Sequence, residues 1–135
     1  MPVGEVGVYG DGTDICIATY ANGLWMSLRV AKRLEAEGIR SRIVDLRWLN
    51  PLPTESLMPH VDASKGLLIV DECRESSGIA AALLAQVLER SPQTRSKRVV
   101  GADTYIPLGG AANLVLVQET DIEAGLRGLY AEVSE

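Results

Sequence analysis

The sequence predicts an α/β domain of three layers, in which helices cover both faces of a mostly parallel sheet. Two observations lead to this fold class. Segments rich in Val, Ile and Leu alternate along the chain with segments of helical period. Strands and helices that alternate at this spacing imply parallel pairing through right-handed crossovers. The continuous apolar run at residues 66–71 is also typical of a strand that is buried on both faces.

Composition limits the class of protein further. A chain of 135 residues with 47% hydrophobic and 23% charged residues fits one soluble globular domain with one core. The apolar runs fall short of the ~20 residues that cross a bilayer, and no signal peptide is visible, so a cytoplasmic location is expected. The net charge of −5 argues against nucleic acid as a partner.

Two strands are expected at the start of the chain. Residues 6–9 form a short strand candidate, and residues 13–19 form a longer one. The motif Gly10-Asp11-Gly12 between them is rich in turn formers. The residues alone therefore allow the first strand to fold back as a hairpin onto the second.

A helix over residues 24–37 is predicted next, because apolar side chains recur there at helical spacing. They are Leu24, Leu28, Ala31 and Leu34. Gly38 follows where a left-handed residue commonly ends a helix. The β-branched and apolar content of residues 39–46 then predicts a strand, and Asn50-Pro51 turns the chain out of it.

The middle of the chain continues the alternation. It contains a short helix over residues 54–60 that ends at His60, a strand over 66–71, a helix over 78–90 and a strand over 97–101. The only basic cluster flanks the last of these strands and consists of Arg95, Lys97 and Arg98. Solvated side chains are expected there rather than an anion or partner site.

The last element is predicted to be a helix over residues 121–133. Its apolar stripe is formed by Ile122, Leu126, Leu129 and Val133. Thr120 and Glu123 have the spacing of a capping box, in which each side chain bonds the backbone of the other residue. The helix is therefore expected to begin at Asp121.

One crevice is a candidate ligand site. In an open parallel sheet, ligands collect outside the carboxyl ends of the strands, where neighbouring crossovers leave on opposite faces. Here that place lies between residues 20–23 and residues 71–74. The candidate ligand residues are Asn22, Glu72 and Ser77, because the helix that opens beside Ser77 has backbone N–H groups that could hold a small anion.

A purely structural interpretation of the same residues competes with the ligand site. Serine at the start of a helix commonly serves as its cap. Asp71 and Glu72 can form ion pairs with Arg74 or Arg47, which would leave no charge for a ligand.

Recognisable catalytic and metal-binding patterns are missing. His60 is the sole histidine, and no nucleophile-elbow motif accompanies it. Cys16 and Cys73 have no metal-ligand spacing with each other or with His60, so reduced thiols are expected. Cys16 lies mid-strand and Cys73 just past a strand end, which makes Cys73 the more reactive candidate. No catalytic, cofactor-binding or metal-binding residue is assigned.

Several short motifs, each weak alone, resemble one known family in their order and spacing. They are Pro2-Val3-Gly4-Glu5, residues 8–15, Ala31, Leu34, Gly38-Ile39, Asp45-Leu46-Arg47, Pro51-Leu52, Val70-Asp71-Glu72, Asp103-Thr104 and Pro107. The chain is similar over nearly its whole length to the C-terminal domain of the β subunit of thiamine diphosphate-dependent 2-oxo acid dehydrogenases, of the pyruvate or branched-chain type. The Asp-Leu-Arg junction favours this family over transketolase itself and deoxyxylulose phosphate synthase, which share the fold.

This resemblance implies a specific topology and context. The transketolase C-terminal fold has a mixed sheet of five strands in the order 1-3-2-4-5, with the first strand antiparallel at the edge. Residues 1–135 would then be a single domain excised from a longer subunit and inactive alone. Thiamine diphosphate and magnesium would belong to the preceding domain. The implied partners are an α subunit, a second β subunit and the dihydrolipoyl acyltransferase core.

The chain also departs from the family pattern. Gly10-Asp11-Gly12 resembles the start of the magnesium and diphosphate motif, but residues 37–42 lack the Asn that this motif needs about 25 to 30 residues downstream. A plain turn is expected. Ser76-Ser77-Gly78-Ile79 replaces a Gly-Gly-x-Gly-like segment. Pro107-Leu108-Gly109-Gly110 replaces a Pro-Tyr/Phe-Ala segment in a loop that packs near the partner subunit in the family.

Two functions from different classes therefore remain. In the first, an acidic C-terminal region helps to dock the basic binding domain of the acyltransferase. Its residues are Glu119, Asp121, Glu123, Glu132 and Glu135, which could equally be the solvated face of an amphipathic helix. In the second, a freestanding domain binds a small anionic ligand in the crevice. A phosphoacceptor receiver domain fits less well, because it needs clustered carboxylates after its first strand, where residues 20–22 are Tyr-Ala-Asn.

Overall fold

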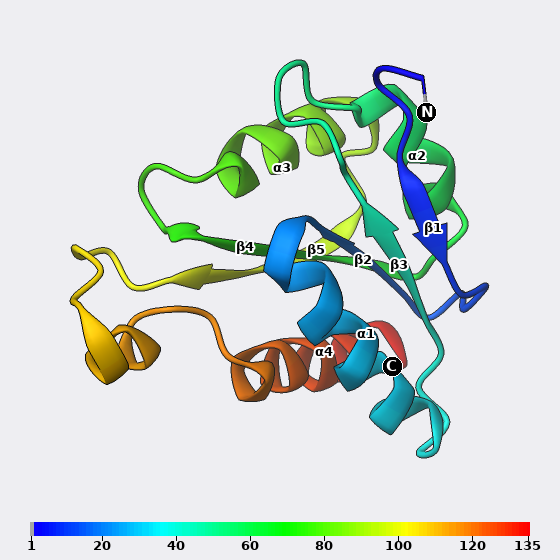
Figure 1. Ribbon diagram of the computed structural model, residues 1–135. Coiled ribbons are helices and arrows are strands. Elements are labelled where there is room, and N and C mark those ends of the chain that lie inside the picture. Colours follow the sequence, from blue (N-terminus) through cyan, green and yellow to red (C-terminus); the bar gives the residue numbers. More distant parts are fainter. Residues whose placement is uncertain (1) are drawn as a thin grey trace.

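A computed structural model describes residues 2–135 as one sheet with helices on both sides (Figure 1). The elements are β1 (Gly7–Tyr9), β2 (Ile15–Thr19), α1 (Ala21–Glu35), β3 (Ser41–Asp45), α2 (Thr54–Asp62), β4 (Gly66–Arg74), α3 (Ile79–Arg90), β5 (Arg95–Gly101), the 3-10 helix η1 (Gly109–Leu114) and α4 (Glu119–Val133). Every predicted helix and strand is present, with ends shifted by a few residues. None of the described helices has the length and apolar character needed to cross a membrane.

The sheet has five strands in the order β1-β3-β2-β4-β5, as the resemblance implies. β2 pairs in parallel with both β3 and β4, β4 pairs in parallel with β5, and β1 pairs antiparallel with β3. A hairpin between β1 and β2 is therefore wrong. Both edges of β2 are occupied by parallel neighbours, so β1 pairs with the outer edge of β3 instead.

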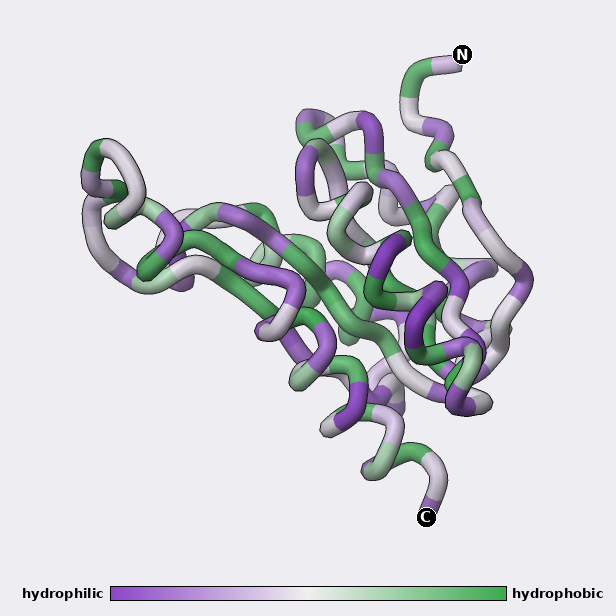
Figure 2. The backbone as a smooth tube through the Cα atoms, turned by 60° about the horizontal axis from the view of Figure 1, so that its bottom comes forward, coloured by the Kyte–Doolittle hydropathy of each residue, from purple (hydrophilic) through white to green (hydrophobic). Residues whose placement is uncertain are grey.

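Helices α1 and α4 cover one face of the sheet, and α2 and α3 cover the other (Figure 1). The alternation of side chains along β2 divides the core accordingly. Ile15 and Ile17 pack toward α1 and α4, whereas Cys16 and Ala18 pack toward α2 and α3. All four are fully buried, which explains why the central strands are continuously apolar. Figure 2 shows the apolar segments running through the middle of the molecule.

The predicted end of the first helix is confirmed, whereas the predicted start of the last helix is wrong. Gly38 has a φ of +89°, as expected for a residue that follows a helix in the left-handed region. The predicted capping box of Thr120 and Glu123 is wrong. α4 begins two residues earlier, and its box is formed by Gln118 and Asp121, whose carboxylate accepts the Gln118 backbone N–H at 2.8 Å.

The basic cluster lies inside β5 rather than beside it, because this strand begins at Arg95. Lys97 pairs with Glu132 of α4 at 2.6 Å, and Arg98 lies 3.5 Å from Glu75. Two of the three basic side chains therefore lie beside different acidic partners, which partly compensate the charge of the cluster.

The Asp-Leu-Arg junction after β3 packs against β1, the strand at the edge of the sheet. Leu46 is fully buried, and the carboxylate of Asp45 accepts the backbone N–H of Arg47 at 3.2 Å. The guanidinium of Arg47 lies 3.6 Å from Asp45 and covers Gly7 of β1 so closely that a Cβ there would overlap it. The motif that suggested the family thus has a structural role.

Candidate functional site

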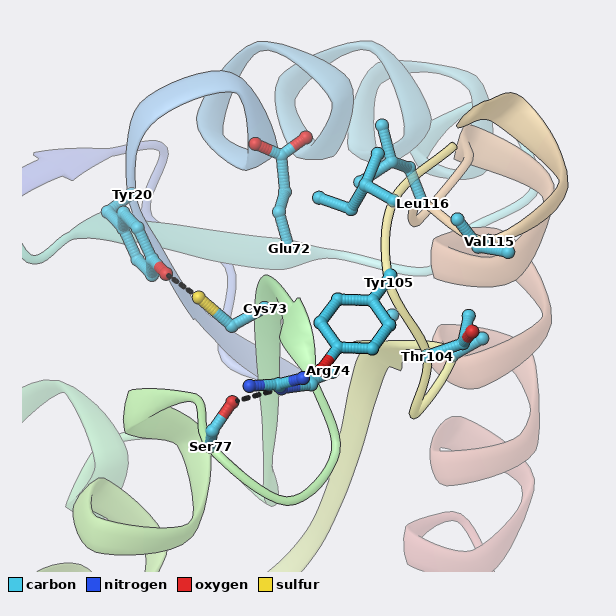
Figure 3. Close-up of a pocket in the computed structure, with 12 residues that line it drawn as sticks. Tyr20, Glu72, Cys73, Arg74, Ser77, Thr104, Tyr105, Val115 and Leu116 are labelled. Atoms are coloured by element: carbon cyan, nitrogen blue, oxygen red, sulfur yellow. Dashed lines mark hydrogen bonds between the residues drawn. The ribbon is translucent and has the colours of Figure 1, made fainter. Parts of the chain in front are cut away.

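The candidate site is a cavity of about 560 Å³ beyond the carboxyl ends of β4 and β5, beside the turn between β2 and α1. The crossovers leave β2 and β4 toward opposite faces, which creates the crevice that the sequence predicts. The cavity is lined by Tyr20, Glu72, Cys73, Arg74, Ser77, Gly101, Ala102, Thr104, Tyr105, Ile106, Val115 and Leu116 (Figure 3). Its volume is within the range of small-molecule sites.

Asp71 organises the base of this region. Its side chain is buried, and its carboxylate accepts three hydrogen bonds, from the Tyr20 hydroxyl at 2.6 Å, the Cys73 backbone N–H at 2.9 Å and the Ala80 backbone N–H at 3.0 Å. The bond from Ala80 means that the start of α3 already holds an internal carboxylate. Burial, together with the bond to Asp71, raises the pKa of Tyr20.

The expected ion pairs of Asp71 and Glu72 with Arg74 or Arg47 do not form. Asp71 is instead bonded to Tyr20 and to backbone N–H groups. Glu72 accepts a hydrogen bond from the side-chain amide of Asn22 at 3.0 Å. Neutral and backbone donors thus satisfy both acids, because Arg74 and Arg47 are bound elsewhere.

The three candidate ligand residues lie in one neighbourhood but do not converge. Glu72 and Ser77 line the cavity, whereas Asn22 is bonded to Glu72 and is not part of the lining. Ser77 accepts a hydrogen bond from Nε of Arg74 at 2.8 Å. It is not the cap of α3, since the N-cap residue is Gly78 and the carboxylate that binds the first turn belongs to Asp71.

The opposite wall of the cavity was not recognised in the sequence. It comes from the segment between β5 and α4, which contributes Thr104, Tyr105, Ile106, Val115 and Leu116. The guanidinium of Arg74 lies 5.9 Å from the centre of the Tyr105 ring, within the range of a cation–π contact. One signal could have pointed to this wall: residues 104–117 carry no charged side chain although they lie outside the predicted elements.

The contacts of the Gly-Asp-Gly motif and of the sole histidine, which were the other possible functional residues, stabilise the fold. Gly10-Asp11-Gly12 lies in the loop between β1 and β2, where Gly10 has a φ of +78° and the Asp11 side chain pairs with Arg40 at 3.1 Å. His60 lies in the last turn of α2, and burial with the nearby charge of Arg42 lowers its pKa. Across residues 2–135, no three His, Cys, Asp or Glu side chains are grouped so that they could hold a metal ion.

The two cysteines differ as expected and form no disulfide. Cys16 is buried in β2, and burial raises the pKa of its thiol to about 12. Cys73 is exposed in the cavity wall, where its sulfur lies 3.6 Å from the Tyr20 hydroxyl.

The acidic residues of the C-terminal region are largely engaged within the domain. Glu119 pairs with Arg29 at 2.5 Å and with Arg33 at 2.7 Å, which ties α4 to α1. Glu123 pairs with Arg127 at 2.9 Å. Glu132 pairs with Lys97, and Asp121 belongs to the capping box. Glu135 follows α4 and is exposed.

Comparison with known proteins identifies the family. The family described as "Transketolase, C-terminal domain" matches residues 4–123. The β subunit of the pyruvate dehydrogenase E1 component from Bacillus subtilis (strain 168) is 32% identical over 125 residues, which cover 90% of this chain and 38% of that subunit. The same subunit from Staphylococcus aureus (strain Mu50 / ATCC 700699) is 31% identical with the same coverage. The chain thus spans about two fifths of these relatives.

Solved structures agree on the fold. A split-gene transketolase described as an inactive beta4 tetramer superposes with a TM-score of 0.83 at 24% identity, covering 97% of this chain and 43% of that chain. A 2-oxoglutarate:ferredoxin oxidoreductase from Magnetococcus marinus superposes with a TM-score of 0.64 at 13% identity, covering 93% of this chain and 20% of that chain. The α/β fold predicted from the sequence and the strand order implied by the resemblance are therefore confirmed, and the chain belongs to the transketolase C-terminal domain family.

Proposed function

We propose that this domain is the C-terminal part of a thiamine diphosphate-dependent 2-oxo acid dehydrogenase β subunit, where it supports subunit association and acyltransferase docking and is inactive alone. The observation that carries the proposal is the alignment of 90% of the chain with pyruvate dehydrogenase E1 β subunits, of which it matches only 38%. A chain that matches one part of a longer catalytic subunit is expected to work with the remaining parts.

The cofactor is expected outside this domain, in the parent enzyme. The Gly10-Asp11-Gly12 loop does not fit magnesium diphosphate, because the Asp11 side chain is 87% exposed and bound to Arg40. Gly12 packs directly against the backbone of Arg40, so its close approach serves the contact with the start of β3. The residues of this chain would therefore serve the fold and its contacts.

Subunit association is supported by apolar side chains on the segment between β5 and α4. Leu108 is 95% exposed and Leu114 is 85% exposed, although each could bury a large apolar area against a partner. The test is sedimentation velocity of the chain over a range of concentrations. We expect self-association that Leu108→Ser with Leu114→Ser weakens and that Val3→Ser, at another exposed apolar site, leaves unchanged. A wild-type chain that stays monomeric at about millimolar concentration would contradict this contact.

Docking of a basic acyltransferase domain is supported by the exposed acids on and after α4. The proposed set remains Glu119, Asp121, Glu123, Glu132 and Glu135. Since internal pairs already compensate most of these charges, a basic partner must compete with Arg29, Arg33, Arg127 and Lys97. Glu132 and Glu135 are the best-placed members, because neither joins α4 to α1 or caps α4.

A binding measurement tests this surface. The cognate peripheral binding domain is titrated with wild-type chain, with Glu132→Gln plus Glu135→Gln, and with Glu89→Gln as a matched control on the other face of the sheet. We expect weaker binding only for the double variant, together with a fall in affinity as salt rises. Equal affinities for all three proteins would remove these acids from the docking surface.

Reconstitution tests the parent activity. Decarboxylation of 2-oxo acids is measured for the chain alone, for the thiamine-site and α polypeptides of the same organism, and for the mixture. Activity is expected only with all parts present. Turnover by the chain alone, or full turnover without it, would refute the proposal. The reading frame upstream of Met1 provides a second check, because a thiamine-site domain is expected there or in a neighbouring gene.

The alternative function is a freestanding doubly wound domain that binds a small anion at the carboxyl ends of the strands. The cavity beside β4 and β5 favours it. The internal carboxylate of Asp71 disfavours the version in which the start of α3 holds the anion, because one of its N–H groups is already bonded. The reconstitution experiment separates the two functions, since a freestanding domain would add nothing to the mixture.

A further inference from the structure

We propose that the cavity beside β4 and β5 binds a small carboxylate with an apolar body, whose carboxylate pairs with Arg74. This inference depends on the cavity alone and holds whether the domain is freestanding or part of a larger subunit. The first ground is size: a cavity of about 560 Å³ can enclose most of a small organic molecule.

The second ground is the chemistry of the walls. Tyr20, Ile106, Val115 and Leu116 present mainly apolar surface, and Figure 3 shows Val115 and Leu116 beside the space that Tyr105 and Arg74 border. Burying an apolar body there removes it from water, which provides a driving force of roughly 25 cal/mol per Å². A fully polar anion would gain none of this energy, so the ligand needs an apolar part.

The third ground is the charge of Arg74. Within residues 2–135, no carboxylate lies within 4 Å of its guanidinium, and its one hydrogen-bond partner is the Ser77 hydroxyl, which accepts from Nε. The Tyr105 ring lies beside the group, with its centre 5.9 Å from the guanidinium carbon. A planar guanidinium held on one side leaves its terminal N–H groups free to bind a carboxylate in a bidentate manner.

Three acidic side chains lie on the segments that border the cavity. Glu72 is the acidic residue of the lining, and Asn22 bonds one of its oxygens. Glu75 lies near Arg98, and Asp103 accepts a bond from Ser76 at 2.6 Å. A bound carboxylate is repelled by Glu72, so Glu72→Gln should tighten binding, because glutamine keeps an acceptor for Asn22 and removes the charge.

The start of α3 does not provide the anion site. Its Ala80 N–H is bonded to the buried carboxylate of Asp71, and Gly78 is too close to Asp71 for even a Cβ to fit between them. This leaves Arg74 as the cation of the cavity and distinguishes the present site from an anion site at the helix terminus.

The experiment is an NMR titration of the ¹⁵N-labelled 135-residue chain with three probes: 4-phenylbutyrate, its neutral amide 4-phenylbutanamide, and acetate. We expect 4-phenylbutyrate to shift amide signals around Arg74, Gly101 and Leu116 and to bind about tenfold more tightly than the amide or acetate. Arg74→Gln should abolish the preference for the acid over the amide, Arg90→Gln should preserve it, and Glu72→Gln should increase it.

The comparison of acid and amide on the wild-type chain needs no variant, so it stays informative if Arg74→Gln disturbs folding. Equal affinity for both probes overturns the role of Arg74. Shifts that gather away from the cavity, or no shifts up to about 10 mM of probe, overturn the site. Signals of Arg74, Gly101 and Leu116 that change with protein concentration but not with probe, in the Leu108→Ser plus Leu114→Ser variant that lacks the association contact, would assign the cavity itself to contact between copies and also overturn the proposal.

Discussion

The hydroxyl of Tyr20 donates a hydrogen bond of 2.6 Å to the buried carboxylate of Asp71, although the two residues are 51 positions apart in the chain. Tyr20 immediately precedes α1, and Asp71 lies in β4 and also binds the start of α3. One carboxylate therefore joins the two crossovers that leave the sheet on opposite faces, and it fixes the shape of the cavity between them.

Removing this hydroxyl should destabilise the domain. In Tyr20→Phe the carboxylate of Asp71 keeps its two backbone donors but loses its side-chain donor. A hydrogen bond to a charged group is worth about 1.5–3 kcal/mol, and we expect a loss of about 2 kcal/mol in the free energy of unfolding. Urea unfolding measures it. Tyr9→Phe, at an exposed position, is the control and should lose less than about 0.5 kcal/mol. Equal stability of both variants would contradict the role of the bond.

Asp14 should make the stability depend on acidity. Burial alone would raise its pKa, but the bond from Lys65 at 2.7 Å and the backbone bond from Arg40 at 2.9 Å lower it below its ordinary value of 3.8. Since the folded-state pKa is the lower one, this stabilisation is complete above 3.8 and is lost as the pH falls through the folded-state value.

The variant Asp14→Asn tests this dependence. At neutral pH we expect it to unfold with a free energy about 1–2 kcal/mol lower than that of the wild type. The difference should shrink as the pH falls below 3.8, because the unfolded wild type then binds the proton that the folded state still resists. Asp62→Asn, at an exposed position, should show neither effect. A difference that stays constant with pH would show that the charge of Asp14 is unimportant.

Gly12 should be intolerant of any side chain. A Cβ at this position would overlap the backbone of Arg40, which cannot move without disturbing the start of β3. We expect Gly12→Ala to cost about 2 kcal/mol or more, measured by thermal and urea unfolding. Gly110→Ala, where a Cβ would meet nothing within 4 Å, is the matched control and should be neutral.

A variant of the neighbouring Asp11 tests whether Gly10-Asp11-Gly12 is a plain loop or binds a metal ion. Asp11→Asn should cost less than about 0.5 kcal/mol, because its pair with Arg40 is exposed. Magnesium with thiamine diphosphate should leave the melting temperature of the chain unchanged. A clear upward shift that Asp11→Asn removes would show that the motif binds metal after all.

The cysteines should react at very different rates. Cys73 is exposed, whereas Cys16 is fully buried with a pKa raised to about 12, so little of it is thiolate at neutral pH. Mass spectrometry after brief alkylation should find one label, on Cys73. Cys73→Ser should label only after denaturant is added. Labelling of Cys16 at a comparable rate in the folded chain would show that β2 is not buried as described.

The sequence by itself determined the elements and the fold class of this protein. The stripe of Leu24, Ala31 and Leu34 and the apolar run of β4 are local patterns, and each expresses the face that its element must bury. Gly38 is likewise a local signal, since its φ of +89° suits glycine wherever a helix ends. The position of the crevice followed from the alternation of crossovers alone.

Only the tertiary structure decided which groups meet. β1 joins β3 because both edges of β2 are taken, a fact of pairing that no local segment contains. The cavity needs a wall from residues 104–116, and Arg74 faces Tyr105 across it. Asp71 binds Tyr20 and Ala80 instead of an arginine. These contacts join residues that are distant in the chain, so periodicity and propensity, which act over a few residues, cannot specify them.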